Sequence, residues 1–379
     1  MKLSRRQTLS LVGGGVIVAA TASTGFAITR QPRRALAPWS AAGGYADARM
    51  NALSWAILAP NPHNRQPWRI DLSVPGQVTL LVDTDRLLPH TDPFSRQIVI
   101  GLGCFLELMR MAASHTGFDV RFDLFPEGSD AARLDGRPVA VATFEERDVT
   151  PDPLFRYAPD RRTLKEPYDL QRPVDPAVLS RIANAARHTH VAATEDTEMV
   201  QTFRALSREA LIIEVETPHT FKESVDLFRI GHKEVDANPD GIDFSGPIFE
   251  AMALAGLFSR EATLDTSSTA YQQGMAAVLE NADTGMAHLW QVTDTNTRED
   301  QIAAGRDWLR LHLAATAEGV GMQPLSQCLQ EYPEMSDLYQ MAHEIMAPDG
   351  GTVQMFARLG YGKAVPASPR WPLEAKVIG

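Results

Sequence analysis

Cysteine and positive charge are scarce in this chain. Its 379 residues include only Cys104 and Cys328 and carry a formal net charge of −11. Two isolated cysteines without a CxxC pair exclude a disulfide framework and a thiolate metal site. An acidic chain is a poor nucleic-acid binder, because such affinity comes mainly from Lys and Arg meeting phosphates. We therefore expect no nucleic-acid partner. We expect a globular protein, since 44% hydrophobic residues can fill one large core or two joined ones.

Several catalytic signatures are missing as well. The chain has no GxSxG turn, which leaves a hydrolase interpretation without support. Its ten histidines do not combine into a metal site, because "HTH" at 188–190 lacks a third ligand and His343-Glu344 lacks the second His of a zinc helix. The stretches "VGGGVIV" and "IVIGLGCFLEL" lack the third Gly of a dinucleotide fingerprint. We expect neither a metal centre nor a Rossmann site.

The first 27 residues read as an export signal. "MKLSRRQTLSLVGGGVIVAATASTGFA" has a basic head, a mildly apolar middle from about Leu9, and small residues near Ala22 and Ala27. Arg5 and Arg6 in "SRRQTL" are typical of the twin-arginine type, the alternative being an ordinary secretory signal or an uncleaved anchor. We expect export by the twin-arginine machinery to a bacterial periplasm, with no stable membrane span after signal removal. That route carries folded proteins, often with a cofactor already inserted.

Hydrophobic periodicity divides the rest of the chain into a linker over 28–44, a first half over 45–150 and a second half over 151–379. In the first half we expect helices over 45–59 and 96–114, and strands over 68–74, 77–84, 118–125 and 138–146. In the second half we expect helices over 176–187 and 197–212, and strands over 286–293 and 352–362. An irregular helical insertion at about 224–279 has no counterpart in the first half, and we interpret it as a lid.

Two helix-like segments echo each other in the two halves. Residues 96–118, "RQIVIGLGCFLELMRMAASHTGF", and 300–321, "DQIAAGRDWLRLHLAATAEGVG", both run Gln-Ile-x-x-Gly, an apolar face and then Ala-Ala-[Ser/Thr]-x-x-Gly, with a two-residue difference in the middle. Two amphipathic helices with a Gly cap can share this by chance. A true duplication, which we favour, predicts an α+β fold of two similar halves packed as a pseudo-dimer, with a site at their seam.

The stretch "APNPHNRQPW" concentrates amides on a stiff backbone. Asn61, Asn64 and Gln66 each offer a donor and an acceptor, which suits the edge of a planar heterocycle or a polyol. The prolines around them would lower the entropy lost on binding. The alternative is a polar turn that leads into a strand, with Trp68 in the core.

Cations gather in the stretch "RRTLK", where Arg161, Arg162 and Lys165 surround Thr163. This pattern suits a phosphate, because guanidinium binds bidentately and Thr adds a neutral donor. In the tail "RLGYGKAVPASPRWPLEAKV", Arg370 lies in a semi-rigid Pro-rich arm that could complete such a site. The alternatives are a solvated linker and a tail that wraps the core. A further stretch, "GVGMQPLSQ", is a Gly-bounded loop whose backbone donors could meet a ligand, or simply a helix cap and a turn.

Taken in order, these stretches resemble the nitroreductase-type flavin proteins, in particular their Acg-like, two-halved branch. The resemblance covers nearly all of the mature chain, from "APNPHNRQPW" through "RRTLKEPYD", "FRIGHKEVDANPDGID", "ATAEGVGMQPLSQ" and "RLGYGKAVPASPRWPLE". No single motif is decisive, and the specificity comes from five in sequence. The resemblance implies a nitroreductase-like fold duplicated in one chain, with FMN held at the interface of the two halves.

By that likeness, the arginine segment and Arg370 hold the ribityl chain and phosphate. The amide loop corresponds to one that comes from the partner subunit in true dimers. Residues 324–326 fall where backbone amides approach the reactive edge of the flavin, although many relatives have an acidic-Gly pair there. The amide loop does not recur and Arg33-Arg34 lacks a hydroxyl neighbour, which predicts one FMN per chain. The predicted cofactor-binding set is Asn61, Asn64, Gln66, Arg161, Arg162, Thr163, Lys165, Pro324, Leu325, Ser326 and Arg370.

The resemblance also implies the chemistry, which the flavin carries while the protein orients it. We expect FMN to pass hydride or electrons to a small planar acceptor, such as a nitroaromatic or a quinone, without a side chain as general acid or base. NAD(P)H is the usual donor, but it is scarce outside the cytoplasm. The alternative is an exported FMN-binding or sequestering protein whose insertion occludes the flavin, and a remote third is a flavin-free relic. We expect a monomeric pseudo-dimer or a homodimer.

Overall fold

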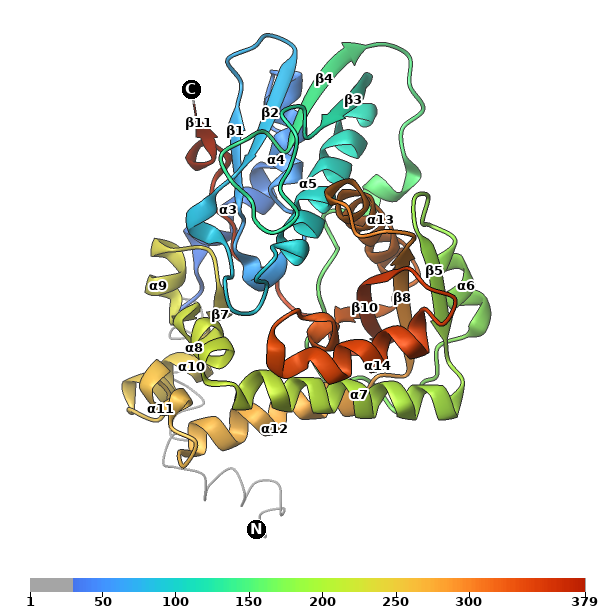
Figure 1. Ribbon diagram of the computed structural model, residues 1–379. Coiled ribbons are helices and arrows are strands. Elements are labelled where there is room, and N and C mark those ends of the chain that lie inside the picture. The colour runs from blue at the N-terminus through green and yellow to red at the C-terminus, as the bar shows by residue number, and fades with distance from the viewer. Residues whose placement is uncertain (1–29, 379) are drawn as a thin grey trace.

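Two β-sheets and two long central helices build this protein, as the computed structural model shows (Figure 1). The structure describes residues 30–378, so the export signal predicted over 1–27 lies outside the described residues. The first sheet has the strand order β11-β1-β2-β4-β3, and the second has the order β5-β8-β10-β9. The mixed α+β class predicted from the sequence is confirmed.

The elements follow the order expected from the periodicity. In the first half they are α3 (Arg33–Ala41), α4 (Ala48–Ala56), β1 (Trp68–Asp71), β2 (Gln77–Val82), α5 (Arg96–His115), β3 (Phe118–Leu124) and β4 (Ala140–Glu146). In the second half they are α6 (Pro176–Ala183), β5 (His190–Thr194), α7 (Thr197–Glu216), β8 (Ala287–Thr293), α13 (Arg298–Ala317), β9 (Gly321–Pro324), α14 (Ser336–Met346), β10 (Thr352–Gly360) and β11 (Val377–Ile378). Between α7 and β8 lie α8 (Pro218–Asp226), β6 (Phe228–Ile230), α9 (His232–Ala237), β7 (Ile242–Phe244), α10 (Pro247–Leu254), α11 (Arg260–Leu264) and α12 (Thr269–Asp283).

Three local expectations were wrong. The segment 28–44, expected to be a linker, contains the helix α3, which buries Ala35 and Pro38. The stretch "GVGMQPLSQ" is not only a loop, because its first part forms the edge strand β9 beside β10. The strand β5 was missed, because its burial does not alternate cleanly and it lies at the sheet edge, where only β8 pairs with it. In each case tertiary pairing decides the structure where the local pattern is weak.

The second half repeats the first. Without β11, both sheets have the same antiparallel plan, in which β1, β2, β4 and β3 correspond to β5, β8, β10 and β9. One shift in numbering relates the two central helices: their first residues are 96 and 298, and their last residues are 115 and 317. The same shift relates Gly117 to Gly319, which both end their helix with positive φ, as glycine caps do. The structure therefore aligns the two central helices in the same way as the C-terminal part of the similarity between 96–118 and 300–321 does.

The two central helices cross at a pair of glycines. A Cβ atom on Gly103 would lie 2.3 Å from Ile302 O, and one on Gly305 would lie 2.0 Å from Ile100 O. These four residues are also related by the common shift in numbering, so the crossing is the pseudo-twofold axis of the chain. Figure 1 shows α5 and α13 side by side at the centre of the molecule. Within residues 30–378, α5 alone is long and apolar enough to cross a membrane, but 89% of that stretch is buried inside the protein.

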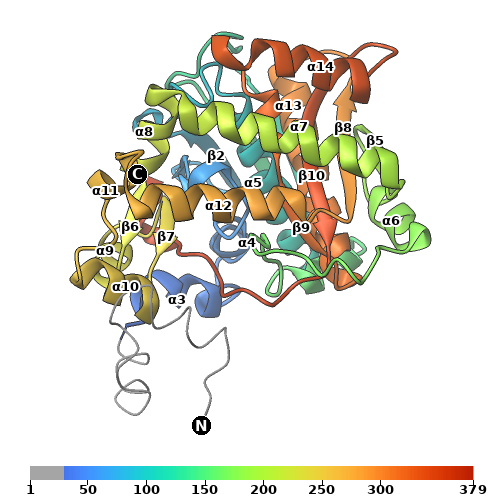
Figure 2. The same cartoon turned by 90° about the horizontal axis from the view of Figure 1, so that it is seen from below.

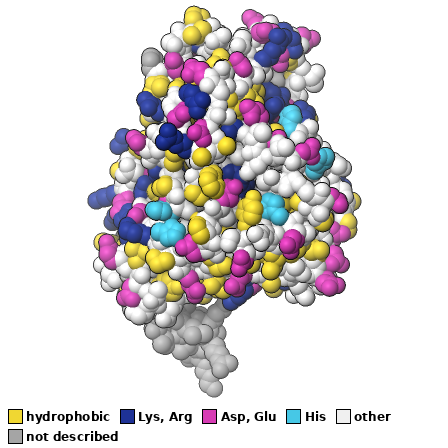
Figure 3. Space-filling model, viewed as in Figure 1, with side chains coloured by type: hydrophobic (Ala, Val, Ile, Leu, Met, Phe, Trp, Pro, Cys, Tyr) yellow, Lys and Arg dark blue, Asp and Glu magenta, His cyan; other side chains and the backbone are white. Residues whose placement is uncertain are grey.

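The C-terminal arm ties the second half to the first. After β10 the chain crosses from the second sheet toward α3 and the insertion (Figure 2). Arg370 N donates to Ala35 O at 2.8 Å, and β11 then pairs in parallel with β1. On the face shown in Figure 3, Lys and Arg are interspersed with Asp and Glu, so the charge there is of mixed sign.

We expect Gly305→Ala to destabilise the protein by about 2–3 kcal/mol or more, because the new methyl group would meet backbone that cannot move freely. The control is Gly274→Ala in α12, where a Cβ meets nothing within 4 Å. That change should stabilise the helix by about 0.5–1 kcal/mol. Urea unfolding of both variants measures the difference. Equal stabilisation by the two changes would contradict the close crossing.

Candidate functional site

The amide loop adopts a strained backbone. His63, Asn64 and Gln66 all have positive φ, at 47°, 51° and 51°. Residues other than glycine adopt this region at a cost and keep it only where the surroundings hold them. Here the short 3-10 helix Pro62–Asn64 packs on α5, since a Cβ on Gly101 would lie 3.1 Å from Asn61 Cβ. The surrounding structure therefore holds this loop in its strained conformation.

The three amides predicted to meet a heterocycle form hydrogen bonds with protein groups in the structure. Asn61 Oδ1 accepts from Gln66 N at 2.7 Å, and its amide nitrogen donates to Ala59 O. Asn64 Nδ2 donates to Pro369 O at 3.0 Å, and its oxygen accepts from Arg370 at 2.5 Å. The amides are therefore occupied in positioning the C-terminal arm and the loop itself.

Gln66 joins three parts of the chain. It is fully buried, and its Nε2 donates to Pro239 O of the insertion at 2.6 Å. Its Oε1 accepts from Trp371 N at 2.9 Å, and its backbone oxygen accepts from the Lys376 ammonium at 2.8 Å. Burial lowers the pKa of Lys376 to about 7, and Arg86 adds to that shift. The loop is thus the meeting point of the first half, the insertion and the C-terminal arm.

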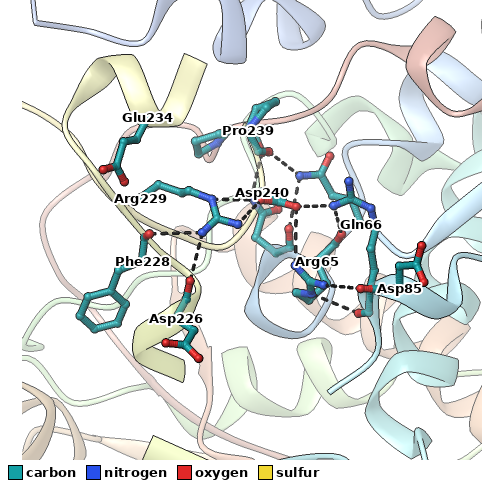
Figure 4. Close-up of polar contacts among 12 residues, drawn as sticks. Arg65, Gln66, Asp85, Asp226, Phe228, Arg229, Glu234, Pro239 and Asp240 are labelled. Carbon is teal, nitrogen blue, oxygen red and sulfur yellow. Dashed lines mark hydrogen bonds and ion pairs between the residues drawn. The ribbon is translucent and has the colours of Figure 1, made fainter. Parts of the chain in front are cut away.

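Asp240 fastens the insertion to this loop (Figure 4). Its carboxylate accepts from Arg229 at 2.7 Å, hydrogen-bonds to Arg86, and lies 3.6 Å from Arg65 of the loop. Gly241 N donates to Asn64 O at 3.3 Å. Burial alone would raise the pKa of Asp240, but the hydrogen bonds and charges of Arg229 and Arg86 hold it below its ordinary value. One carboxylate therefore contacts three arginines where the insertion meets the loop.

Three arginines gather behind the loop without a matching acid. Arg161 and Arg370 are both buried and donate to the same carbonyl, Leu58 O, at 3.1 Å each. Arg162 donates to Pro159 O, and its guanidinium lies 4.5 Å from the centre of the Trp39 ring. Within residues 30–378, none of these three guanidinium groups forms an ion pair with a carboxylate. The structure thus gathers three positive charges that are partly neutralised by backbone, amide and hydroxyl oxygens and, at Arg162, by the charge of Asp160.

The electrostatics of this cluster favour an anion. Burial, together with the charge of the nearby Arg162, lowers the pKa of Arg161 to about 10. Burial together with Arg161 and Arg162 depresses the pKa of Arg370 still more. Arg370 Nε is buried and has no hydrogen-bond partner among the described residues. Buried donors are rarely left unpaired, and an anionic ligand would supply both the acceptor and the missing charge.

Thr163 and Lys165 continue from the cluster along an extended segment. Thr163 forms a parallel bridge with Met322 of β9, which fixes the segment against the second sheet. The Lys165 side chain is accessible to solvent, yet neighbouring protein strips part of its hydration and lowers its pKa, while the Glu214 carboxyl opposes that shift. The charge of Lys165 also lowers the pKa of His63. Lys165 therefore faces residues of both the loop and α7.

Residues 324–326 lie along β9 and its end, but their polar groups are already used. Leu325 N donates to Phe356 O at 2.9 Å. The Ser326 hydroxyl donates to Phe356 O and accepts from Phe356 N, both at 3.1 Å. Pro324 has no N–H to offer. These contacts place the turn firmly on β10 and leave little of it free for a ligand.

Comparisons with known proteins find similarity to proteins named as nitroreductases. No family model matches the chain. It is 31% identical over 125 residues to a candidate NAD(P)H nitroreductase, acg, of Mycobacterium tuberculosis, and this match covers 32% of the chain and only 38% of that relative. A second candidate NAD(P)H nitroreductase of the same organism is 25% identical over 334 residues, which is 86% of this chain and 89% of that protein. The FMN-dependent nitroreductase NfnB of Mycobacterium smegmatis, solved with NADPH, superposes with 15% identity and a TM-score of 0.33 over 58% of this chain and 94% of its own.

A second arginine cluster occupies the equivalent place in the other half. Arg310 donates to Ala185 O at 2.8 Å, two residues past the end of α6, as Arg161 does to Leu58 O two residues past α4. Here, however, acids are present. Arg310 pairs with Asp152 at 2.6 Å, and Glu107 pairs with Arg110, Arg306 and Arg310. The two clusters thus occupy similar positions, but among the described residues only the second contains carboxylates that pair with its arginines.

Sequence reasoning missed the side chains between the loop, α7 and α8. His63 Nε2 lies 3.1 Å from Ser224 Oγ, and Ser224 Oγ lies 3.4 Å from Glu214 Oε1. The sequence analysis assigned no role to His63, and nothing marked Glu214 within its helix. An acid on the buried face of an amphipathic helix was the one available signal.

We expect Asp240→Asn to loosen the insertion, because removing one partner of a buried ion cluster leaves charges unpaired and costs about 3–5 kcal/mol. Amide hydrogen exchange over residues 227–244 should speed up at least 100-fold. The control is Asp226→Asn, which removes only an exposed pair with Lys222 and should change exchange less than threefold. Unchanged exchange in the Asp240 variant would show that the insertion is held in some other way.

Proposed function

We propose that this protein is an FMN-dependent oxidoreductase of the nitroreductase type. The observation that carries the proposal is the cluster of Arg161, Arg162 and Arg370, in which Arg161 and Arg370 are buried and Arg370 Nε has no hydrogen-bond partner among the described residues. None of the three guanidinium groups forms an ion pair with a carboxylate of residues 30–378. A phosphate monoester dianion meets these needs, because it brings several acceptor oxygens and two negative charges. The similarity to two nitroreductase-named relatives, one of them over 86% of the chain, supports the same class.

The residues around the cluster suggest how FMN would be held. Arg161 and Arg370 would bind the phosphate, Arg162 would add charge, and Thr163 would offer its hydroxyl to the phosphate or ribityl chain. Lys165, further along the same segment, would lie toward the ring system. Bound FMN would supply hydride or electron transfer to a small planar acceptor of the nitroaromatic or quinone class. Asn61, Asn64 and Gln66 would act indirectly, by holding Arg370 and the insertion in place.

The charge balance of the two clusters supports one FMN per chain. In the equivalent cluster, Glu107 and Asp152 already form ion pairs with the arginines. A phosphate there would meet two carboxylates and lose the attraction that the first cluster offers. We therefore expect a single site at the seam, built from both halves, in a monomeric pseudo-dimer or a homodimer of such chains.

A second function is favoured by the clamp on the insertion. Asp240 and Gln66 hold the segment 238–241 on the amide loop, which would restrict access to a flavin beneath it. A protein that keeps this clamp closed would bind or sequester FMN without turnover. Donor chemistry separates the two functions, because an enzyme must let NAD(P)H or another electron donor reach the ring.

The experiment is to purify the mature protein and examine its flavin. We expect a yellow protein that releases FMN on denaturation at one per chain, and that NAD(P)H or dithionite bleaches, with quinone restoring the colour. Bleaching by dithionite alone, without quinone turnover, would instead support sequestration. A colourless protein that takes up no added FMN would contradict both functions.

A variant sharpens this test. Arg161→Gln should weaken FMN binding by about 10- to 100-fold in Kd, since a hydrogen bond to a charged group contributes about 1.5–3 kcal/mol. Arg208→Gln, which removes only a surface pair with Asp283, is the control and should leave Kd unchanged. Equal Kd values for the two variants would remove Arg161 from the phosphate site.

We also propose that the chain is exported to the periplasm by the twin-arginine machinery. The support is the pair Arg5-Arg6 before a mildly apolar stretch. Replacing both by Lys should abolish the periplasmic fraction, because that machinery reads the arginine pair, whereas the same change at Arg33-Arg34 should not. Cell fractionation measures the outcome. Normal export of the Arg5-Arg6 variant would indicate an ordinary secretory signal.

A further inference from the structure

Three side chains from three different segments form a hydrogen-bonded chain at the seam. His63 comes from the amide loop of the first half, Ser224 from α8 of the insertion, and Glu214 from α7 of the second half. Ser224 Oγ lies 3.1 Å from His63 Nε2 and 3.4 Å from Glu214 Oε1. A hydroxyl between an imidazole and a carboxyl can accept a proton on one side while it donates on the other.

The surroundings of Glu214 favour proton transfer over a fixed ion pair. Glu214 Oε2 is buried and has no hydrogen-bond partner among the described residues. The charged or titratable groups that face this carboxyl are Lys165, Glu223 and Tyr332. The hydrogen-bonded chain of side chains ends at His63, whose pKa is lowered by the charges of Lys165 and Arg65. Lys165 is thus the common neighbour of both ends, and it belongs to the segment that we assign to the flavin.

We propose that Glu214, Ser224 and His63 form a proton relay that serves the ligand site beside Lys165. The relay rests on the proposed redox function. It goes beyond that function because it assigns an acid to a reaction expected to need none.

The chemistry of the acceptor class gives the relay its task. Reduction of a quinone to a hydroquinone takes up two electrons and two protons. A hydride, which originates from NAD(P)H or another two-electron donor, brings both electrons and one proton, so one more proton must come from an acid. Protonated Glu214 would give its proton to Ser224, Ser224 would pass its own to His63 Nε2, and His63 would release its Nδ1 proton to the acceptor oxygen. Glu214, left ionised, would be protonated again from solvent.

The protonation states fit this direction. Burial raises the pKa of Glu214 to about 7, and the Glu223 charge contributes to the rise. Burial, together with the charges of Lys165 and Arg65, lowers the pKa of His63 to about 4. Near neutral pH the carboxyl is therefore close to half protonated and the imidazole is neutral. When Glu214 changes between its protonated and its ionised form, the neutral imidazole of His63 can respond only by changing its tautomer. This change of tautomer makes the relay observable.

The test follows His63 by nitrogen NMR in the purified, histidine-labelled protein between pH 5 and pH 8.5. With Glu214 protonated, Ser224 donates to His63 Nε2, so the ring carries its proton on Nδ1. With Glu214 ionised, Ser224 donates to the carboxylate and accepts from the ring, so the proton moves to Nε2. We expect this exchange of tautomers with a midpoint near pH 7, and a single tautomer throughout that range would overturn the relay.

Variants separate a relay from a merely buried acid. Glu214→Gln should keep the shape and abolish the exchange of tautomers, and Ser224→Ala should abolish it although Glu214 still titrates. Glu216→Gln, an exposed acid on the same helix, is the control and should keep it. Persistence of the exchange in Ser224→Ala would contradict transfer through the hydroxyl.

The kinetic arm uses the flavin-loaded protein. In Glu214→Gln the rate of flavin reoxidation by quinone should fall about 100-fold, as for loss of a general acid, and should lose its dependence on pH near 7. A full rate with the wild-type pH profile would overturn the relay even if FMN is bound. A protein that binds no FMN would instead defeat the proposed function, and the NMR result would show separately whether the side chains are coupled.

Discussion

The close crossing of α5 and α13 is the constraint on which the rest of the structure depends. Gly103 and Gly305 let two backbones touch where any side chain would collide with a carbonyl oxygen. Because the same shift in numbering relates the glycines and the helix ends, the crossing generates a pseudo-twofold axis within one chain. Each sheet then lies on its own side of that axis. The seam between the halves, where the arginine cluster lies, is a direct consequence.

The seam is completed by segments that break the symmetry. The C-terminal arm brings Arg370 to the first half, and the insertion brings Asp240 and Pro239 to the amide loop. Gln66 contacts the insertion and the arm together, and its strained backbone is held by both. The loop therefore serves as a junction that positions the charged groups. A junction of this kind also couples the state of the insertion to the anion site, since moving Pro239 would release Gln66 and then the arm.

Local patterns predicted the elements well and the contacts poorly. The helix over 96–114 was evident because it is apolar over its whole length, and the echo with 300–321 identified the repeat. The amides of the loop were read as ligand contacts, because a local sequence cannot show that Gln66 meets Trp371, 305 residues away. The helix α3 was missed for the same reason, since Arg370 and the arm stabilise it from outside its own sequence. Spacing along the chain specifies periodicity, whereas long-range partners decide which polar group remains free.

The two arginine clusters show how the halves of a duplicated fold come to differ in their charge pairing. Both halves place an arginine against the carbonyl oxygen two residues past a helix end. In one half Glu107 and Asp152 form ion pairs with the arginines of the cluster. In the other half the groups near Arg161 include the uncharged Cys104 and His312, and burial lowers the pKa of both Arg161 and Arg370. Such an imbalance is costly in the isolated protein, so its persistence is best explained by a negatively charged ligand that restores the balance on binding.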